Sequence, residues 1–539
     1  MAKRVYNNAM KLMLSLLFVF LSIVGLADAG YITYNELNGV VPPCNVSGFK
    51  CESVLSSEWA HIGPLPISVL GLIFYGSIFM LATLHLTEVN LRPLGTRLAQ
   101  MFGISDKKAL AAHPLSWITP QDLLTFMGGI GFLFSLYLVI LMAFVIKAWC
   151  LYCLISAVNA LLLFVFTRVY SQDARSQTPI FTQFFTSSIV AWFYQTIVKR
   201  ICFLVDAEVV HTSIVSAGWL LGSNPITRFI TRSGLGFHSP ALAVRRDGIT
   251  FANPVGLAAG FDYFASLTDI LPEVGFGWHT IGTVTLEPYD GNTPPRLGRY
   301  PESQALLVNK GFKSPGARAV INRLSGKSFS IPVGISIGST NKIFENTKAQ
   351  LVDILTTFWL FERSNVNHAY YELNISCPNT KGGQPFTTPD SLEVLLEALD
   401  HITLSRPVYV KMPIDKTDAE ALGLLAVIDR HVISGVIFGN LTKDKTNPAL
   451  VPADSAHWQT ASGNVSGKPT WDRSNRLIKL TRKHYPKRFT IVGTGGVFTP
   501  EDVATKLALG ADLVQLITGM VFKGPQLIGQ MSNFLVRTK

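Results

Sequence analysis

The most constraining feature of this sequence is an apolar segment at residues 123–170 that contains the tetrapeptide Cys150-Leu151-Tyr152-Cys153. Residues 123–146 carry no charge, and this stretch is long enough to cross the ~30 Å hydrocarbon layer of a membrane as a helix. After Lys147 and the two cysteines, residues 154–166 are apolar again. A CxxC pair between two membrane spans indicates a thiol–disulfide centre; two cysteines packed in a core are the alternative. No second CxxC or His pair accompanies it, so a zinc site is not indicated.

The composition changes near residue 180 of this 539-residue chain. The part before it is membrane-like, and the part after it has the polar and apolar mixture of a soluble domain. The formal net charge of +11 comes partly from basic residues that flank membrane spans. No basic tract interleaved with aromatic residues argues for a nucleic-acid partner. Four of the six cysteines fall in the membrane part, which suggests two working pairs there.

Four spans are predicted, at residues 12–27, 66–86, 123–146 and 154–166. The first follows a basic amino end; a cleaved signal peptide is the alternative, and we expect an uncleaved span because the run continues through residues 30–34. The 87–122 connection carries four basic residues, whereas the 31–65 loop holds one lysine against three glutamates. The positive-inside rule then puts the 87–122 connection in the cytoplasm and all four cysteines on the outer side, where disulfides form in bacteria.

Residues 10–170 resemble the vitamin K epoxide reductase family, through the Cys44-x6-Cys51 loop and residues 54–57, 63–68 and 148–154. The resemblance implies a four-helix bundle that holds a quinone beside the CxxC pair, and the predicted topology places this bundle in a bacterial inner membrane. It further implies that Cys150 and Cys153 exchange electrons with the quinone, and that Cys44 and Cys51 receive them from a partner thiol. Ser57 would bond the quinone oxygen; a helix cap is its alternative role. No thioredoxin-like domain follows the bundle, so a separate thioredoxin-like thiol protein is expected as the partner.

A polar linker is predicted at residues 171–180, before two helix-like stretches within residues 180–221 that are rich in aromatic and aliphatic side chains. Lys199 and Arg200 lie between the two stretches. These helices either pack on the following domain or dip into the bilayer with basic residues at the headgroups. The predicted domains are therefore the bundle at 1–170, the linker, amphipathic helices at 181–235, and a last domain at 236–539.

The last domain alternates short apolar runs with helix-like stretches, which is typical of a parallel sheet. Eight such units favour a closed TIM barrel, whose active site lies at the carboxyl ends of the strands. Unusual polar residues fall there, at 374–380, Lys411 and Asn440, and glycine turns at 493–496 and 518–519 suggest a phosphorylated cofactor. The eight strands are predicted at 256–260, 279–285, 332–338, 370–376, 407–412, 435–440, 489–496 and 513–519.

Residues 190–535 resemble the quinone-using class of dihydroorotate dehydrogenases, through 253–262, 282–285, 291–296, 374–380, 466–469 and 493–497. The resemblance implies proton abstraction from substrate C5, hydride transfer from C6 to FMN, and electron transfer to ubiquinone or menaquinone in the membrane pool. Cys377 takes the position of the general base, where this class usually has serine, and the helical pair would form the quinone tunnel. Asn309, Asn379, Asn440 and Lys313 would face the dihydroorotate-like substrate or the flavin. FMN would be held by Ala258, Gly260, Thr283, Asn374, Lys411, Ser466, Gly467, Gly495, Gly496 and Thr518.

The substrate end departs from the family pattern. Tyr263 stands where a lysine is expected, and Lys313, which replaces an asparagine, is a candidate for restoring that charge. Ser336, Leu441 and Ile517 are further departures. Three hypotheses follow: both parts are active enzymes on one quinone pool, the barrel is a non-catalytic module, or the barrel binds FMN and oxidises another substrate.

Overall fold

The computed structural model describes residues 2–44, 46–171, 178–454 and 462–539, and the chain separates into two compact units at Phe185 and Thr186. Most of the predicted linker lies outside the described residues; helix α7 ends at Ser171 and helix α8 begins at Ile180. The boundary between the units therefore falls inside α8 (Ile180–Phe193), several residues after the predicted domain boundary.

The first unit is built on four long helices, α1 (Ala2–Leu37), α3 (Ile67–Leu86), α6 (Pro120–Ile140) and α7 (Leu151–Ser171). A π-helical turn, η3 (Leu141–Ile146), extends α6. The candidate membrane spans are Ser15–Leu37, Ile67–Leu86, Pro120–Ile146 and Leu151–Arg168, which confirms the four predicted spans. The first helix runs ten residues past its predicted end because the polar residues after Ala27 lower the hydropathy without breaking the helix before the turn at Asn38.

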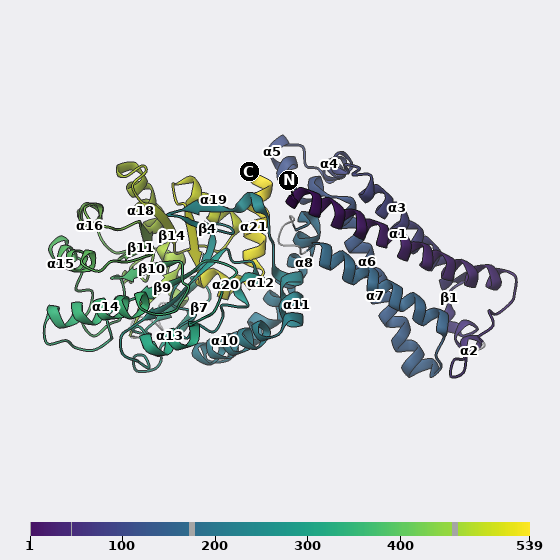
Figure 1. The fold of residues 1–539 in the computed structure, drawn as a ribbon, viewed down its shortest axis with the longest axis horizontal. Helices are drawn as coiled ribbons and strands as arrows, with labels where there is room; N and C mark the ends of the chain where they lie inside the picture. Colours follow the sequence, from purple (N-terminus) through teal and green to yellow (C-terminus); the bar gives the residue numbers. More distant parts are fainter. Residues whose placement is uncertain (1, 45, 172–177, 455–461) are drawn as a thin grey trace. The chain divides into compact units, whose positions relative to one another are not determined.

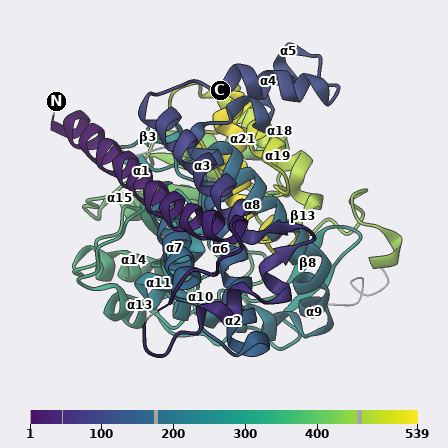
Figure 2. The ribbon, with the colours of Figure 1, turned by 90° about the vertical axis from the view of Figure 1, so that its right-hand side faces the viewer.

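Apolar side chains from all four long helices form the core of this unit. Phe18 of α1, Tyr75 of α3, Leu124 of α6 and Leu163 of α7 belong to one buried cluster, and α1 lies alongside α3 (Figure 1, Figure 2). Helix α6 begins at a capping box formed by Thr119 with Asp122. Short elements connect the helices: α2 (Cys51–Leu55), η1 (Glu58–Ala60), β1 (His61–Ile62), β2 (Leu65–Pro66), α4 (Arg92–Met101), α5 (Lys107–Ala112) and η2 (Pro114–Trp117).

The second unit begins with a layer of helices and continues as a closed barrel. The predicted helical pair is a longer series: α8, the π-helical turn η4 (Tyr194–Val198), α9 (Lys199–Leu204), α10 (Ala207–Ser223) and α11 (Pro225–Leu235). Eight parallel strands then close the barrel in the order in which they occur in the chain, which confirms the predicted fold (Figure 1). They are β5 (Val255–Leu257), β6 (Trp278–Val284), β9 (Val333–Ile337), β10 (Tyr370–Asn374), β11 (Val408–Met412), β12 (Gly435–Phe438), β14 (Thr490–Thr494) and β15 (Leu513–Leu516).

Every residue of β6, β10 and β11 is buried, including polar ones such as Glu372 and Lys411, because both faces of a parallel sheet covered by helices are buried. Aromatic residues at the amino ends of the strands, including Trp278, Tyr370 and Tyr409, pack with Phe251. This cluster fills the amino end of the barrel and leaves the carboxyl end for the site. The helices that follow or cover the strands are α12 (Leu271–Val274), α13 (Ala317–Leu324), α14 (Thr347–Glu362), α15 (Pro389–Asp400), α16 (Asp418–Asp429), α18 (Trp471–His484), α19 (Pro500–Ala508), α20 (Thr518–Lys523) and α21 (Leu527–Thr538).

Two small sheets complete the second unit. The hairpin β3 (Val244–Arg246) and β4 (Ile249–Phe251) precedes the barrel. A three-stranded antiparallel sheet joins β7 (Leu297–Tyr300), β8 (Ala305–Val308) and β13 (Asn464–Gly467). Because β8 pairs with β13, Ser466 lies opposite Leu306 and Gly467 opposite Ala305, although the two strands are far apart in sequence.

Candidate active sites

A cavity of about 530 Å³ opens at the carboxyl end of the barrel and continues among η4, α9, α10 and α11. Its polar end is lined by most of the residues that the sequence singled out, and Tyr263, Leu441 and Ile517 line it as well. Asn309 and Lys313 do not line the cavity, whereas their neighbours Val308 and Lys310 do. The predicted residues brought together are Ala258, Gly260, Thr283, Asn374, Cys377, Asn379, Lys411, Asn440, Ser466, Gly467, Gly495, Gly496 and Thr518.

A hydrogen-bonded row crosses the barrel beneath the cavity. Asn374 Nδ2 donates to Thr283 Oγ1 at 2.9 Å, and Thr283 Oγ1 lies 3.0 Å from Ser336 Oγ. Ser336 Oγ donates in turn to Glu372 Oε1 at 2.8 Å, and Lys411 Nζ lies 3.5 Å from the same oxygen. Ser336 is thus a buried link behind the site, which fixes Asn374 and Lys411 in place.

Two glycines bring backbone close to the cavity after strands β14 and β15. At Gly495, φ is +94° and an added Cβ would lie 2.4 Å from Thr470 Oγ1. At Gly519, an added Cβ would lie 1.9 Å from the Val497 carbonyl oxygen. Between these turns, Ser466 Oγ lies 2.9 Å from Thr518 Oγ1. Exposed N–H groups and hydroxyls in this arrangement suit a phosphate group.

Cys377 lies among amide side chains. Asn440 Nδ2 donates to Ser376 Oγ at 2.6 Å, and Asn379 Nδ2 donates to the Val308 carbonyl at 2.8 Å. Burial raises the pKa of the Cys377 thiol to about 11, although the Asn379 backbone N–H and the charge of Lys411 act to lower it. The thiol is therefore largely protonated at neutral pH.

Tyr263, which stands in the position of the expected lysine, is buried against two basic side chains. Its ring lies 5.7 Å from the His211 ring and 5.8 Å from Lys310 Nζ. Burial raises the pKa of the Tyr263 hydroxyl and lowers that of His211. Lys310 was not singled out from the sequence, although it adjoins Asn309 in the same turn; Asn309 instead accepts a hydrogen bond from Asn292 Nδ2 at 2.9 Å.

The far end of the cavity is apolar and is formed by the helical layer. Val198, Phe203, Ile214, Leu221 and Leu235 line it. The outer face of the same layer exposes large apolar side chains, an arrangement typical of a surface that contacts a membrane or another protein. These side chains include Trp192, Ile201, Leu204, Trp219, Leu220, Ile226 and Ile230, each at least 59% exposed.

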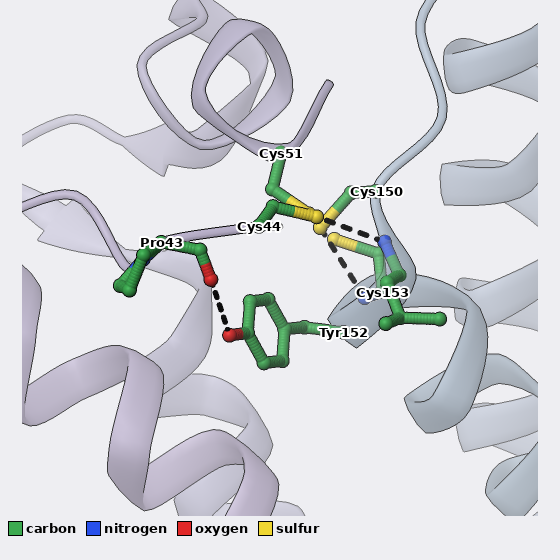
Figure 3. The surroundings of a disulfide bond; sticks show 7 residues. Pro43, Cys44, Cys51, Cys150, Tyr152 and Cys153 are labelled. Atoms are coloured by element: carbon green, nitrogen blue, oxygen red, sulfur yellow. Dashed lines mark hydrogen bonds between the residues drawn. A yellow bond between two sulfur atoms is a disulfide. The ribbon is translucent and has the colours of Figure 1, made fainter. Parts of the chain in front are cut away.

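In the first unit, both cysteine pairs meet at one end of the helices. Cys44 and Cys51 form a disulfide, and Cys150 and Cys153 are free thiols in the same buried cluster (Figure 3). The Leu151 N–H donates to Cys51 Sγ at 3.4 Å. The Cys153 thiol, and the N–H groups at the start of α7, lower the pKa of the Cys150 thiol against the opposing effect of burial.

Ser57 lies after helix α2 in the same unit. Its hydroxyl donates to the Val54 carbonyl at 2.7 Å, and it makes no side-chain cap bond to the following turn η1. The cap role considered as an alternative is therefore not what its hydroxyl does here. Tyr152, which the sequence did not single out, donates from its hydroxyl to the Pro43 carbonyl at 2.8 Å and so fixes the Cys44 loop against α7 (Figure 3).

Comparison with known proteins finds two families in this chain. The family described as dihydroorotate dehydrogenase matches residues 241–537, and the vitamin K epoxide reductase family matches residues 16–168. A dihydroorotate dehydrogenase (quinone) of Trichodesmium erythraeum is 33% identical over 296 residues, covering 54% of this chain and 77% of that protein. One of Neisseria meningitidis is 32% identical over 352 residues, covering 63% and 97%. The crystal structure of the Eimeria tenella enzyme with ferulenol matches with a TM-score of 0.54 at 25% identity, covering 61% of this chain and 90% of that one.

Proposed function

Because the chain belongs to the dihydroorotate dehydrogenase family and carries a vitamin K epoxide reductase family domain ahead of the barrel, we propose a bifunctional membrane oxidoreductase whose two parts both reduce quinone. In this proposal the barrel oxidises dihydroorotate with FMN. The bundle oxidises thiols of a separate thioredoxin-like protein.

The observation that carries the barrel activity is one cavity with two chemically different ends. The polar end fits FMN, because glycine backbone at Gly495 and Gly519 and the hydroxyls of Ser466 and Thr518 surround a space suited to phosphate. When bound there, FMN would supply hydride acceptance and electron transfer to quinone. The apolar end fits an isoprenoid quinone, because aliphatic side chains of α10 and α11 line it.

The chain's own side chains would bind and orient the substrate and take its proton. Asn379 and Asn440 present amide groups that the surrounding hydrogen bonds hold in place, so they can orient a planar ring that carries N–H and C=O groups. Cys377 Sγ is the proton acceptor, and the proton moves onto sulfur. Lys411 lowers the pKa of this thiol, which favours the thiolate needed for that step.

The burial of the four sulfur atoms supports a direction for thiol exchange in the bundle. Cys44 is half-buried and Cys51 is 1% exposed, so Cys44 is the sulfur that an external thiol can reach. Cys51 is positioned beside the Cys150–Cys153 loop through the Leu151 N–H. The reduced Cys44–Cys51 pair would attack an oxidised Cys150–Cys153 pair, which leaves a Cys44–Cys51 disulfide and two thiols on the CxxC pair. The state in the structure corresponds to the product of that exchange.

Oxidation of the CxxC dithiol by quinone then returns the bundle to its starting state. Two electrons and two protons leave Cys150 and Cys153, the disulfide forms, and quinone becomes quinol. We place Ser57 at the quinone oxygen. The charge distribution of the loops supports a bacterial inner membrane protein whose barrel is cytoplasmic and whose cysteines face the periplasm.

A barrel with another substrate is the second candidate. Tyr263 and Leu441 both line the polar end, so these two departures from the family pattern fall where a substrate would be recognised. Purification in detergent, a visible spectrum and anaerobic addition of dihydroorotate separate the candidates. Yellow flavin that bleaches supports the proposal, flavin that stays oxidised indicates another substrate, and a colourless protein indicates a non-catalytic barrel. The Cys377→Ala variant is the matched control, because it should bind flavin and bleach slowly.

A further inference from the structure

An excess of positive charge lies at the polar end of the barrel cavity, around Glu208 of helix α10. Three cations converge on one carboxylate oxygen, Glu208 Oε1: Lys310 Nζ at 2.8 Å, Arg296 Nη1 at 3.1 Å and Lys313 Nζ at 3.6 Å. One carboxylate cannot neutralise three cations. A partly buried cluster with such a surplus is stabilised when an anion joins it.

Of these three cations, Lys310 is the one that lines the cavity. Its side chain is 7% exposed, and it lies two residues after the end of strand β8. Burial lowers its pKa and the charges of Lys313 and Arg296 add to that effect, while Glu208 opposes it. An anionic ligand within the cavity would therefore replace solvation that this ammonium group has lost.

Lys411 and Arg299, the other lysine and arginine that line the cavity among the described residues, are not part of the Glu208 cluster. Lys411 Nζ lies 3.5 Å from the buried carboxylate of Glu372. Arg299 Nη1 donates to the Val205 carbonyl at 2.9 Å, and its guanidinium lies 4.9 Å from the Phe203 ring, toward the apolar end. Lys310 is left as the cation that lies beside Tyr263, 5.8 Å from its ring, and Cys377 is close enough to Tyr263 to raise its pKa.

We propose that Lys310 is a specificity-determining residue that binds the carboxylate of the substrate, in the region where Tyr263 supplies no charge. This inference rests on the proposed function and assigns the role to Lys310 instead of Lys313. Glu208 holds the ammonium group in place when the cavity has no anion, and the carboxylate shares it when the substrate binds. The binding affinity of a neutral ring without a carboxylate should not depend on Lys310.

The test is binding of orotate, the carboxylate product, and of uracil, which has a similar ring without a carboxylate, to the full-length FMN-loaded protein. Binding is followed by the shift of the visible flavin spectrum. We expect Lys310→Met to weaken orotate binding at least tenfold and uracil binding less than twofold, since one charge-assisted hydrogen bond is lost. Lys313→Met should have a smaller effect on orotate. Lys342→Met is the matched control, because Lys342 pairs with Glu287 on the surface at 2.8 Å.

A second variant distinguishes the loss of a charge from misfolding of the protein. Tyr263→Lys combined with Lys310→Met should recover orotate binding, because Lys310 Nζ and the Tyr263 ring are neighbours at 5.8 Å. If Lys310→Met fails to hold flavin, Lys310→Arg decides: recovery of flavin and of orotate binding supports the role of charge, and no recovery overturns it.

Three results overturn the inference: orotate affinity of Lys310→Met within twofold of the parent protein, equal losses for orotate and uracil, or a parent protein whose flavin spectrum does not respond to orotate. Failure of the proposed function gives a different experimental result. A parent protein that binds orotate through Lys310 but is not bleached by dihydroorotate keeps the carboxylate site and loses the proposed activity.

Discussion

Flavin reduction in this barrel should accelerate steeply with pH, because the proposed proton acceptor is a buried thiol. Burial raises the pKa of Cys377 to about 11. At about pH 8 this leaves roughly one thiolate per thousand molecules, and at about pH 9 roughly one per hundred. Because the thiolate is the competent base, the rate constant for reduction by dihydroorotate should rise about tenfold per pH unit between about pH 7 and 10.

The assay is anaerobic stopped-flow decay of the visible flavin band at saturating dihydroorotate. Cys377→Ser provides the matched control, since a hydroxyl does not titrate in this range and its profile should be flat over the same interval. Cys377→Ala should slow reduction by about 10²- to 10⁴-fold at every pH. A parent profile that reaches a plateau below about pH 9, or an equal slope in Cys377→Ser, would refute the assignment of the titration to this thiol.

Three further predictions concern the cofactor turn, the bundle and a buried lysine. Gly495→Ala places a Cβ 2.4 Å from Thr470 Oγ1 at φ +94°, so flavin binding should weaken at least about tenfold by visible absorbance; Gly326→Ala, at φ +74° with nothing within 4 Å, should retain flavin. Cys150→Ala should abolish quinone reduction by dithiothreitol, and a rate above a third of the parent rate would contradict the proposed electron path. Burial lowers the pKa of Lys506 to about 7 from 10.5. The folded state therefore binds fewer protons than the unfolded chain between these values, and melting temperature should rise from about pH 7 to 10, a trend that Lys506→Met removes.

The barrel could be predicted because its strands are buried on both faces, and the bundle because its four spans are apolar over their whole length. The eight barrel strands, from Val255 to Leu516, lie between a filled interior and a shell of helices, so their sequences lack polar alternation. The ends of the helices were harder to predict than the number of membrane spans and barrel strands. Helix α1 continues past Asp28, a residue that lowers hydropathy but does not interrupt backbone hydrogen bonding. The last helix of the layer, α11, was included in the predicted range but not recognised as a separate helix, because its composition is more polar.

The sequence predicted the candidate site well where the backbone conformation requires a particular residue type. It predicted less where the direction of a side chain determines whether the residue lines the cavity. Gly495 adopts a positive φ against Thr470, so the sequence pattern and the geometry coincide there. Whether Lys310 or Lys313 reaches the cavity depends on the turn between them, in which Phe312 has φ +61°. The hydrophobic periodicity of the sequence does not predict such a turn. The pairing of β8 with β13, which places Leu306 opposite Ser466, is likewise a long-range contact that local patterns do not encode.

The apolar end of the cavity has a consequence for how inhibitors of the quinone step should be dosed. Because α9–α11 line that end and expose large apolar side chains, we expect an apolar inhibitor to reach it from the lipid, so that its effective concentration is the mole fraction in the membrane. Potency in detergent or vesicles should then scale with the partition coefficient of the compound and fall as inert lipid is added at constant total dose. A competitor of the polar, carboxylate-binding end arrives from water and should be indifferent to added lipid.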